Sequence, residues 1–281
     1  MPERFIRQPG LPGPRRIAAV SAGAIPVEAE IHAGGRLLDA IAELITGCGG
    51  ESACLTLTGG GLGPFGYVIP ALSPDARHAA FYSAPRRPPG VSRLETGAIT
   101  LGWRDGSPFF HSHALWTEAD GTRGCGHVLP EETFVAETIR ASGVAIIGAR
   151  FEAMQDEETG FRLFSPVATS TPLRKGAKPG VALRLAPNQD LVRTLETVAL
   201  TARLGEAAVR GGVASTIGAR FADAPPIPGF ATELLVTRGT VGAASAIEIA
   251  IVDLDGTIGQ GRLVAGDNPV LMTFEGFLEA L

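Results

Sequence analysis

The chain has 281 residues, a length that predicts one large domain or two modest ones. Its residues are 45% hydrophobic and 19% charged, a composition that can bury a core and that excludes wholesale disorder. The formal net charge of -5 argues against nucleic acid as the ligand, because affinity for nucleic acid comes largely from neutralising phosphates.

The sequence also indicates a compartment. No apolar run is long enough to span a bilayer, and residues 1–16 lack the apolar core of a signal peptide. The three cysteines, Cys48, Cys54 and Cys125, are an odd number with no close paired spacing. We therefore expect free thiols, a reducing cytoplasm and no membrane partner.

The first predicted elements are a strand that ends in AEIHAGG (29–35) and an amphipathic helix that follows it. The helix has one apolar stripe, formed by Leu37, Leu38, Ile41, Leu44 and Ile45. Short runs rich in Val, Ile, Thr and Phe come next and predict antiparallel strands. One of them contains GLGPFG (61–66), which fits the dinucleotide pattern G-x-G-x-x-G. Because Pro64 and a strand-like run follow instead of a helix, we interpret it as a glycine loop.

Residues 109–130 hold three of the five histidines, on either side of one Asp-Gly turn. FFHSHALW and GCGHVL read as the two strands of a hairpin. A three-residue loop over 119–121, with Gly121 in the left-handed position, places His113 opposite His127. His111 lies two residues from His113 and so shares its face. A two-residue loop would shift the register and separate the rings.

Three convergent imidazoles with an open fourth position are typical of Zn²⁺ sites. We predict a metal site formed by His111, His113 and His127, holding Zn²⁺ or another divalent transition metal such as Fe, Ni or Cu. The alternative is a group of ordinary strand histidines. Cys125 points to the other face and is expected to be a packed thiol.

A cupin is a further alternative, because HSHALWTE (111–118) resembles the H-x-H-x₄-E start of a cupin metal motif. Glu118 would then be a ligand. In the predicted hairpin Glu118 lies near the turn, roughly 17 Å along the strand from His113. The second cupin motif has no clear match, so a two-cupin oxygenase is a weaker hypothesis.

The later elements repeat the earlier ones. ARFEAMQDEETGFRLFSPV (149–167) predicts a hairpin that turns at Thr159-Gly160, and the polar stretch 169–180 is the expected boundary. A second amphipathic helix follows, with an apolar stripe of Leu191, Val192, Leu195 and Val198. We predict an α+β fold with domains over 1–170 and 171–281, each a mostly antiparallel sheet with one packed helix.

Residues 113–146 align without a gap with residues 248–281, so that the D-G-T of the turn recurs. In this alignment Glu248 and Arg262 stand where His113 and His127 stand. The second domain therefore lacks the histidines, and we expect one site per chain, in the first domain.

These motifs resemble the plants-and-prokaryotes-conserved (PPC) domain. The resemblance lies in LETGAITL, HSHAL, the Asp-Gly turn, GCGHVL and DEETGF, and covers most of residues 25–165. Cys125 stands inside the last histidine motif, which in the family runs G-G-H. Over 180–281 the resemblance is weaker, which indicates a degenerate tandem copy.

The resemblance implies a mostly antiparallel α/β domain, commonly assembled as a trimer. In prokaryotic members the three matching histidines are associated with metal binding, and no settled activity comes with the family. In plants the domain accompanies AT-hooks and mediates protein association in the nucleus, but this sequence has no R-G-R-P hook.

Two hypotheses follow for function. The first is a cytoplasmic, homo-oligomeric metalloprotein whose open coordination position binds water or a small anionic or carbonyl ligand. If it is an enzyme, metal-activated water or Lewis-acid polarisation is the expected chemistry, and no general base can be named. The second is a non-catalytic protein- or DNA-interaction module linked to transcription.

Overall fold

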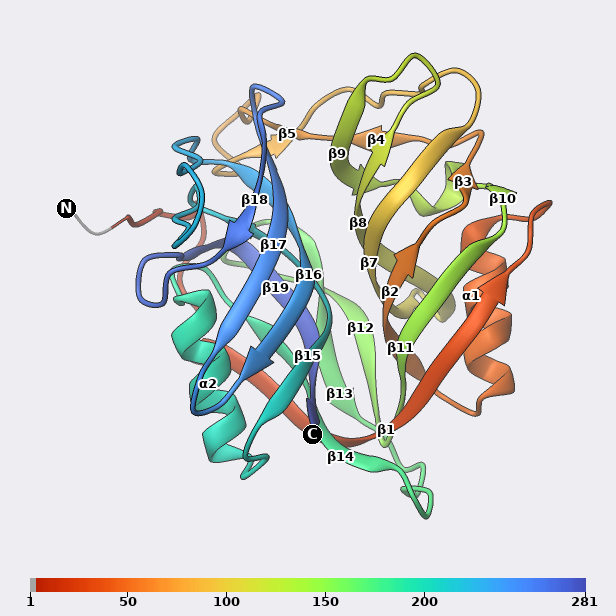
Figure 1. Cartoon of the computed structure of the whole chain (residues 1–281). Coiled ribbons are helices and arrows are strands. Elements are labelled where there is room, and N and C mark those ends of the chain that lie inside the picture. Colours follow the sequence, from red (N-terminus) through yellow and green to blue (C-terminus); the bar gives the residue numbers. More distant parts are fainter. Residues whose placement is uncertain (1–3) are drawn as a thin grey trace.

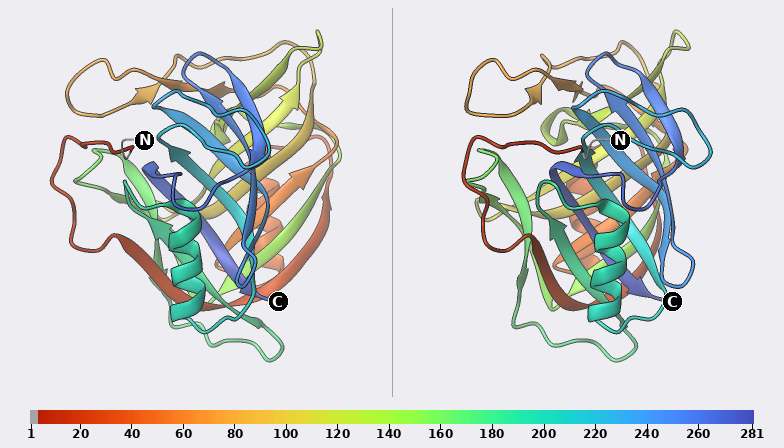
Figure 2. Two further views of the ribbon diagram at one scale, coloured as in Figure 1. Left: turned by 60° about the vertical axis from the view of Figure 1, so that its left-hand side comes forward. Right: turned by 90° about the vertical axis from the view of Figure 1, so that its left-hand side faces the viewer.

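The computed structural model describes residues 4–281 as a mostly antiparallel β-structure with two α-helices (Figure 1). Within these residues, hydrogen bonds link 17 strands into one sheet, and two further strands form a separate pair. The helices α1 (Leu37–Gly47) and α2 (Leu191–Thr201) lie on opposite outer sides, with the strands between them (Figures 1 and 2). Strands dominate, so the expected α+β class fits only loosely.

The strands of the first half end at the hairpin that the sequence predicts around Thr159-Gly160. They are β1 (Ile17–Ile31), β2 (Ser52–Thr58), β3 (Gly61–Leu62), β4 (Tyr67–Val68), β5 (Pro70–Ala71), β6 (Phe81–Tyr82), β7 (Ser92–Arg104), β8 (Ser107–Thr117), β9 (Arg123–Val128), β10 (Val135–Glu137), β11 (Ile139–Ile147), β12 (Ala149–Gln155) and β13 (Arg162–Ala168). A 3₁₀ turn covers Pro130–Glu132.

The second half repeats a shorter version of this order. Its strands are β14 (Lys178–Leu185), β15 (Ala207–Thr216), β16 (Thr232–Val241), β17 (Ala246–Asp253), β18 (Ile258–Arg262) and β19 (Val270–Ala280). Neither α1 nor α2 is long and apolar enough to cross a membrane.

Both helices form where the apolar stripes predict them and bury those stripes. In α1 the buried side chains are Leu37, Leu38, Ile41 and Ile45. In α2 the side chain of Asp190, the N-cap residue, accepts a hydrogen bond from the backbone N–H of Arg193, which satisfies one otherwise unpaired donor of the first turn. Helix stability here comes mainly from packing of the apolar face, since helices of this length are marginal alone.

Strand β1 belongs to both halves of the sheet. Its first part pairs with β14, from Ile17 opposite Leu185 to Ala24 opposite Lys178. Its second part pairs with β11 and ends at Ile31. One continuous backbone therefore joins the two halves in the same sheet.

The cores of the two halves are also shared. The buried cluster around α1 and β2 includes Val213 and Leu235 from the second half. Another buried cluster combines residues of β1, β2 and β11 with Ala182 and Phe277. The division into domains 1–170 and 171–281 stays a prediction, because the packing does not separate there.

The repeated Asp-Gly turns have the same geometry. In the β8–β9 turn the N–H of Gly121 donates to the carbonyl oxygen of Glu118 at 3.0 Å, and Gly121 has φ of 89°. In the β17–β18 turn the N–H of Gly256 donates to the carbonyl oxygen of Asp253 at 3.1 Å, with φ of 80° at the glycine. Only glycine adopts this left-handed conformation without steric cost. The aligned sequence repeat is therefore also a structural repeat.

Candidate metal centre

The β8–β9 turn sets the register on which the histidine prediction depends. The N–H of Glu118 donates to the carbonyl oxygen of Thr122 at 2.7 Å, so the loop has three residues, 119–121. Counting outward, His113 lies directly opposite His127, as the sequence predicts. In the second half the same register places Glu248 opposite Arg262.

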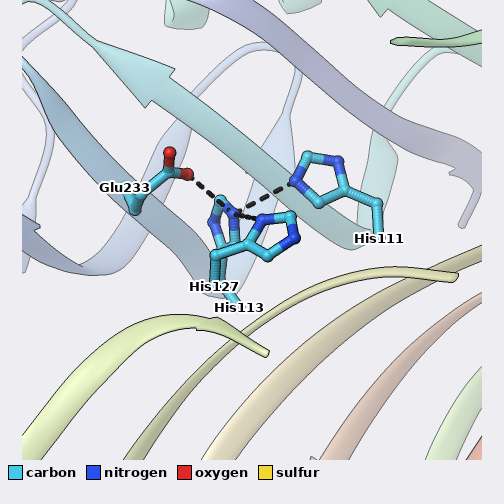
Figure 3. Close-up of side chains that lie close together, drawn as sticks. All are labelled: His111, His113, His127 and Glu233. Carbon is cyan, nitrogen blue, oxygen red and sulfur yellow. Dashed lines mark hydrogen bonds and ion pairs between the residues drawn. The ribbon is translucent and has the colours of Figure 1, made fainter. Parts of the chain in front are cut away.

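The three imidazole rings converge on one side of the β8–β9 hairpin (Figure 3). The ring centroids of His111 and His113 are 4.8 Å apart, those of His111 and His127 are 4.9 Å apart, and those of His113 and His127 are 5.3 Å apart. His113 is fully buried, whereas the other two rings are partly exposed. The strands thus present three ring nitrogens to one small volume.

A carboxylate from the second half completes the group. Glu233 lies on β16, and its Oε2 is 2.7 Å from Nε2 of His113. The four potential ligand atoms, one from each of His111, His113, His127 and Glu233, all lie within 4.8 Å of one another. Among the described residues 4–281, these four could together hold a metal ion.

The distances within the group suit a tetrahedral ion. Nε2 of His113 is 3.1 Å from Nε2 of His111 and 3.3 Å from Nδ1 of His127. Zinc bonds of about 2.0–2.1 Å in a tetrahedron put neighbouring ligand atoms about 3.3 Å apart. A neutral His113 has a single ring hydrogen, which cannot satisfy all the electron-rich atoms around the ring, whereas a shared cation attracts all four ligand atoms. The donor set therefore fits a divalent transition metal.

Two outer hydrogen bonds orient the rings. Nδ1 of His113 lies 2.7 Å from the backbone carbonyl oxygen of Leu234 and donates to it. Nδ1 of His111 lies 2.8 Å from Oε2 of Glu275, which is fully buried on β19. A histidine that donates through Nδ1 presents Nε2 as a lone pair, and such partners raise the basicity of metal ligands. Both partners belong to the second half of the chain.

Burial and charge act differently on the rings. The pKa of His127 lies well below its usual value, because burial disfavours the imidazolium and because protonated His111 and His113 would repel it. Burial also acts against the charged form of His111, but the carboxylates of Glu275 and Glu233 outweigh it and raise the pKa of His111. A neutral His127 keeps the lone pair that a metal ligand needs.

The other residues that the sequence analysis considered lie elsewhere. The carboxylate of Glu118 accepts hydrogen bonds from Tyr67 Oη at 3.3 Å and Trp116 Nε1 at 3.5 Å, and it is outside the ligand group. Cys125 is buried in the core, where burial raises the pKa of its thiol. His78, a histidine outside the predicted site, packs against the ring of Phe161. The segment GLGPFG contains β3 and leads to β4, without the helix that a dinucleotide site requires.

Sequence reasoning missed Glu233 and Glu275, although a signal for them exists. Both are acidic residues inside apolar strands, in ATELLVT and LMTFEGFLEAL. A buried carboxylate is costly unless it is paired or binds a cation. Their positions therefore indicate a partner, but the sequence does not say which one.

Known proteins resemble this chain in structure rather than in sequence. No protein-family model matches the sequence, and no curated protein matches it. The solved structures similar to the chain include a plant- and prokaryote-conserved (PPC) protein from Pyrococcus horikoshii. It is 17% identical with a TM-score of 0.42, and the match covers 53% of this chain and 96% of that one.

Two further structures match at a similar level. A metal-containing protein from Archaeoglobus fulgidus is 20% identical with a TM-score of 0.40, over 50% of this chain and 94% of that one. A candidate DNA-binding protein from Ralstonia eutropha JMP134 is 14% identical with a TM-score of 0.37, over 52% and 96% of the two chains. The chain is thus similar to PPC protein structures over about half of its length.

Proposed function

We propose that this chain is a metal-binding protein in which His111, His113, His127 and Glu233 hold one divalent transition metal ion. The observation that carries the proposal is the convergence of these four donor atoms within 4.8 Å of one another. Three imidazole nitrogens and one carboxylate oxygen form a ligand set that suits Zn²⁺ well. We propose Zn²⁺ as the resident ion.

The carboxylate changes what the site can do. The sequence analysis leaves a fourth position open to water, and in the structure Glu233 occupies that side of the histidines. When bound, a Zn²⁺ ion would supply Lewis-acid chemistry to a ligand that reaches it. Glu233 either completes the coordination of the ion or stands beside the ion as an acid–base group. In both roles its carboxylate would contact a ligand that reaches the ion.

The test is metal analysis of the purified full-length protein, with a stoichiometry of one ion per chain as the expected result. His127→Ala should weaken Zn²⁺ binding at least tenfold, because it removes a ligand from a partly exposed position with little loss of packing. Glu233→Gln should also weaken it, because the amide lacks the negative charge.

Matched controls separate ligands from bystanders. His78→Ala removes a histidine outside the group, and Glu118→Ala removes the carboxylate that a cupin site would require. Both should leave the metal content unchanged. A protein that stays metal-free after incubation with Zn²⁺, Co²⁺, Ni²⁺ and Fe²⁺, or a Glu118→Ala variant that loses metal, would contradict the proposal.

Assembly, location and the interaction-module hypothesis stay predictions. Homo-oligomerisation is tested by the molar mass in solution, and an interaction with duplex DNA by titration at physiological salt. The three cysteines are free thiols in the structure.

A further inference from the structure

A cavity lies directly beside the candidate metal centre. The cavity is small, with room of about 30 Å³ for the centre of a water-sized molecule, and two of the four candidate ligand residues, His111 and Glu233, line it. The rest of its wall comes from β5, β6, β13, β15, β16 and β19 and their flanking residues, so both halves of the chain build it. A molecule in this cavity would touch the donor group at one end.

The wall is mainly apolar. It includes the aromatic rings of Phe81 and Phe161 and the side chains of Leu163, Leu271 and Met272. Ser215 and Thr273 add hydroxyl-bearing side chains to the wall. Among the described residues that line this cavity, none is a lysine or an arginine. The wall therefore offers contacts to an apolar group and no permanently charged cationic side chain to an anion.

A second cavity, which His111 also lines, has a basic residue in its wall. Its wall includes Arg162, whose guanidinium already makes two hydrogen bonds to Asp105, at 2.8 and 2.9 Å. Tyr82, His111 and Leu163 line both cavities. The free positive charge that a carboxylate or phosphate ligand needs is therefore not offered on this side either.

We infer that the site takes a small neutral carbonyl compound with a compact apolar substituent, rather than a carboxylate or a phosphorylated ligand. The carbonyl group faces the donor group, and the substituent fills the cavity between Phe81, Phe161 and Leu271. This inference rests on the proposed function, because it assigns a ligand class to the same metal centre.

The test uses the full-length protein loaded with Co²⁺, whose visible absorption responds to changes around the ion. Butyramide and butyrate form a matched pair that differs in charge but hardly in shape. Butyramide should perturb the spectrum at a concentration at least tenfold lower than butyrate. Acetamide, which lacks two methylene groups, should bind roughly tenfold more weakly than butyramide, since each buried methylene contributes to binding.

A pair of variants locates the ligand. Ala80 lines the first cavity and Ala153 lines the second, so Ala80→Leu fills one and Ala153→Leu the other with the same side chain. Ala80→Leu should keep its Co²⁺ and bind butyramide at least tenfold more weakly. Ala153→Leu should bind it as the unchanged protein does.

The outcomes separate the two proposals. A protein that takes up no Co²⁺ overturns the metal centre and this inference with it. Uptake of Co²⁺ with no response to butyramide, an equal response to butyrate, or equal binding by a folded Ala80→Leu variant overturns the ligand class alone. If Ala80→Leu does not fold, the comparison of butyramide, butyrate and acetamide on the unchanged protein still tests the ligand class.

Discussion

Buried carboxylates explain most of the polar chemistry at the scale of single residues. Glu275 is fully buried and Glu233 nearly so, and each faces an imidazole of the candidate metal centre. Asp156 shows the same rule outside that centre, because its carboxylate pairs with Arg184 at 2.6 Å. In every case a charge inside an apolar strand or at its end has a partner from a distant part of the chain.

Asp156 gives a prediction about pH. Burial acts to raise the pKa of its carboxyl, but the charge of Arg184 and hydrogen bonds from Arg184 and Thr159 outweigh it, so the pKa is lowered. A lowered pKa means that the carboxylate stabilises the fold above about pH 4, its unfolded value, and that this contribution is lost as the pH falls through the folded pKa. Asp156→Asn should therefore lower the free energy of unfolding at pH 7 by about 1–3 kcal/mol.

Urea denaturation at pH 7 and pH 3 measures this effect. The difference between Asp156→Asn and the unchanged protein should be smaller at pH 3 than at pH 7, because at pH 3 the carboxyl takes up a proton when the chain unfolds. Asp105→Asn is the matched control, because Asp105 pairs with Arg162 at the surface and should matter less. An equal difference at both pH values would contradict the role of the charge.

At the scale of elements, the repeated hairpins form a natural pair for comparison. A Cβ atom added to Gly121 or to Gly256 would meet nothing within 4 Å, so a substitution acts only through the backbone. Both glycines have positive φ, a conformation that costs an alanine about 1–2 kcal/mol. Strand β9 carries His127, whereas β18 carries none of the four candidate ligands.

We expect Gly121→Ala and Gly256→Ala to lower the free energy of unfolding by similar amounts. Only Gly121→Ala should speed the loss of Zn²⁺ to a chelator, because it loosens the hairpin that holds His113 opposite His127. The rate of Zn²⁺ loss to an added chelator is compared under conditions in which the two variants are equally stable. Equal rates for both variants would show that the register of β8 and β9 does not limit metal retention.

At the scale of the whole molecule, the two halves share a strand, a core and the donor group. Strand β1 pairs into both halves, Leu235 packs in the cluster around α1, and Glu233 and Glu275 face histidines of the first half. Unfolding of either half would therefore break the candidate metal centre. This coupling predicts cooperative unfolding of the full chain.

Calorimetry tests the coupling. The full chain should unfold in a single transition, and saturating Zn²⁺ should raise its Tm, because the ion binds only the folded state. Glu233→Gln should reduce the rise. Two separate transitions, of which only the earlier or the later responds to Zn²⁺, would show that the halves hold their structure independently.

The sequence by itself determined the local features. The stripe of Leu37, Leu38 and Ile41 predicted α1, and the Asp-Gly turn with its three-residue loop predicted that His113 faces His127. These predictions succeed because helix and hairpin geometry depend on neighbours within a few residues, through side-chain periodicity and the conformation of one glycine.

Only the tertiary structure decided how the candidate centre is completed. His113 meets the carbonyl oxygen of Leu234, and His111 meets Glu275, across separations of 121 and 164 residues in the chain. The hairpin pattern fixes which face of β8 carries the rings, but not which strand packs over that face. That choice depends on the packing of one half of the sheet against the other, which involves the whole shared core and has no local signature.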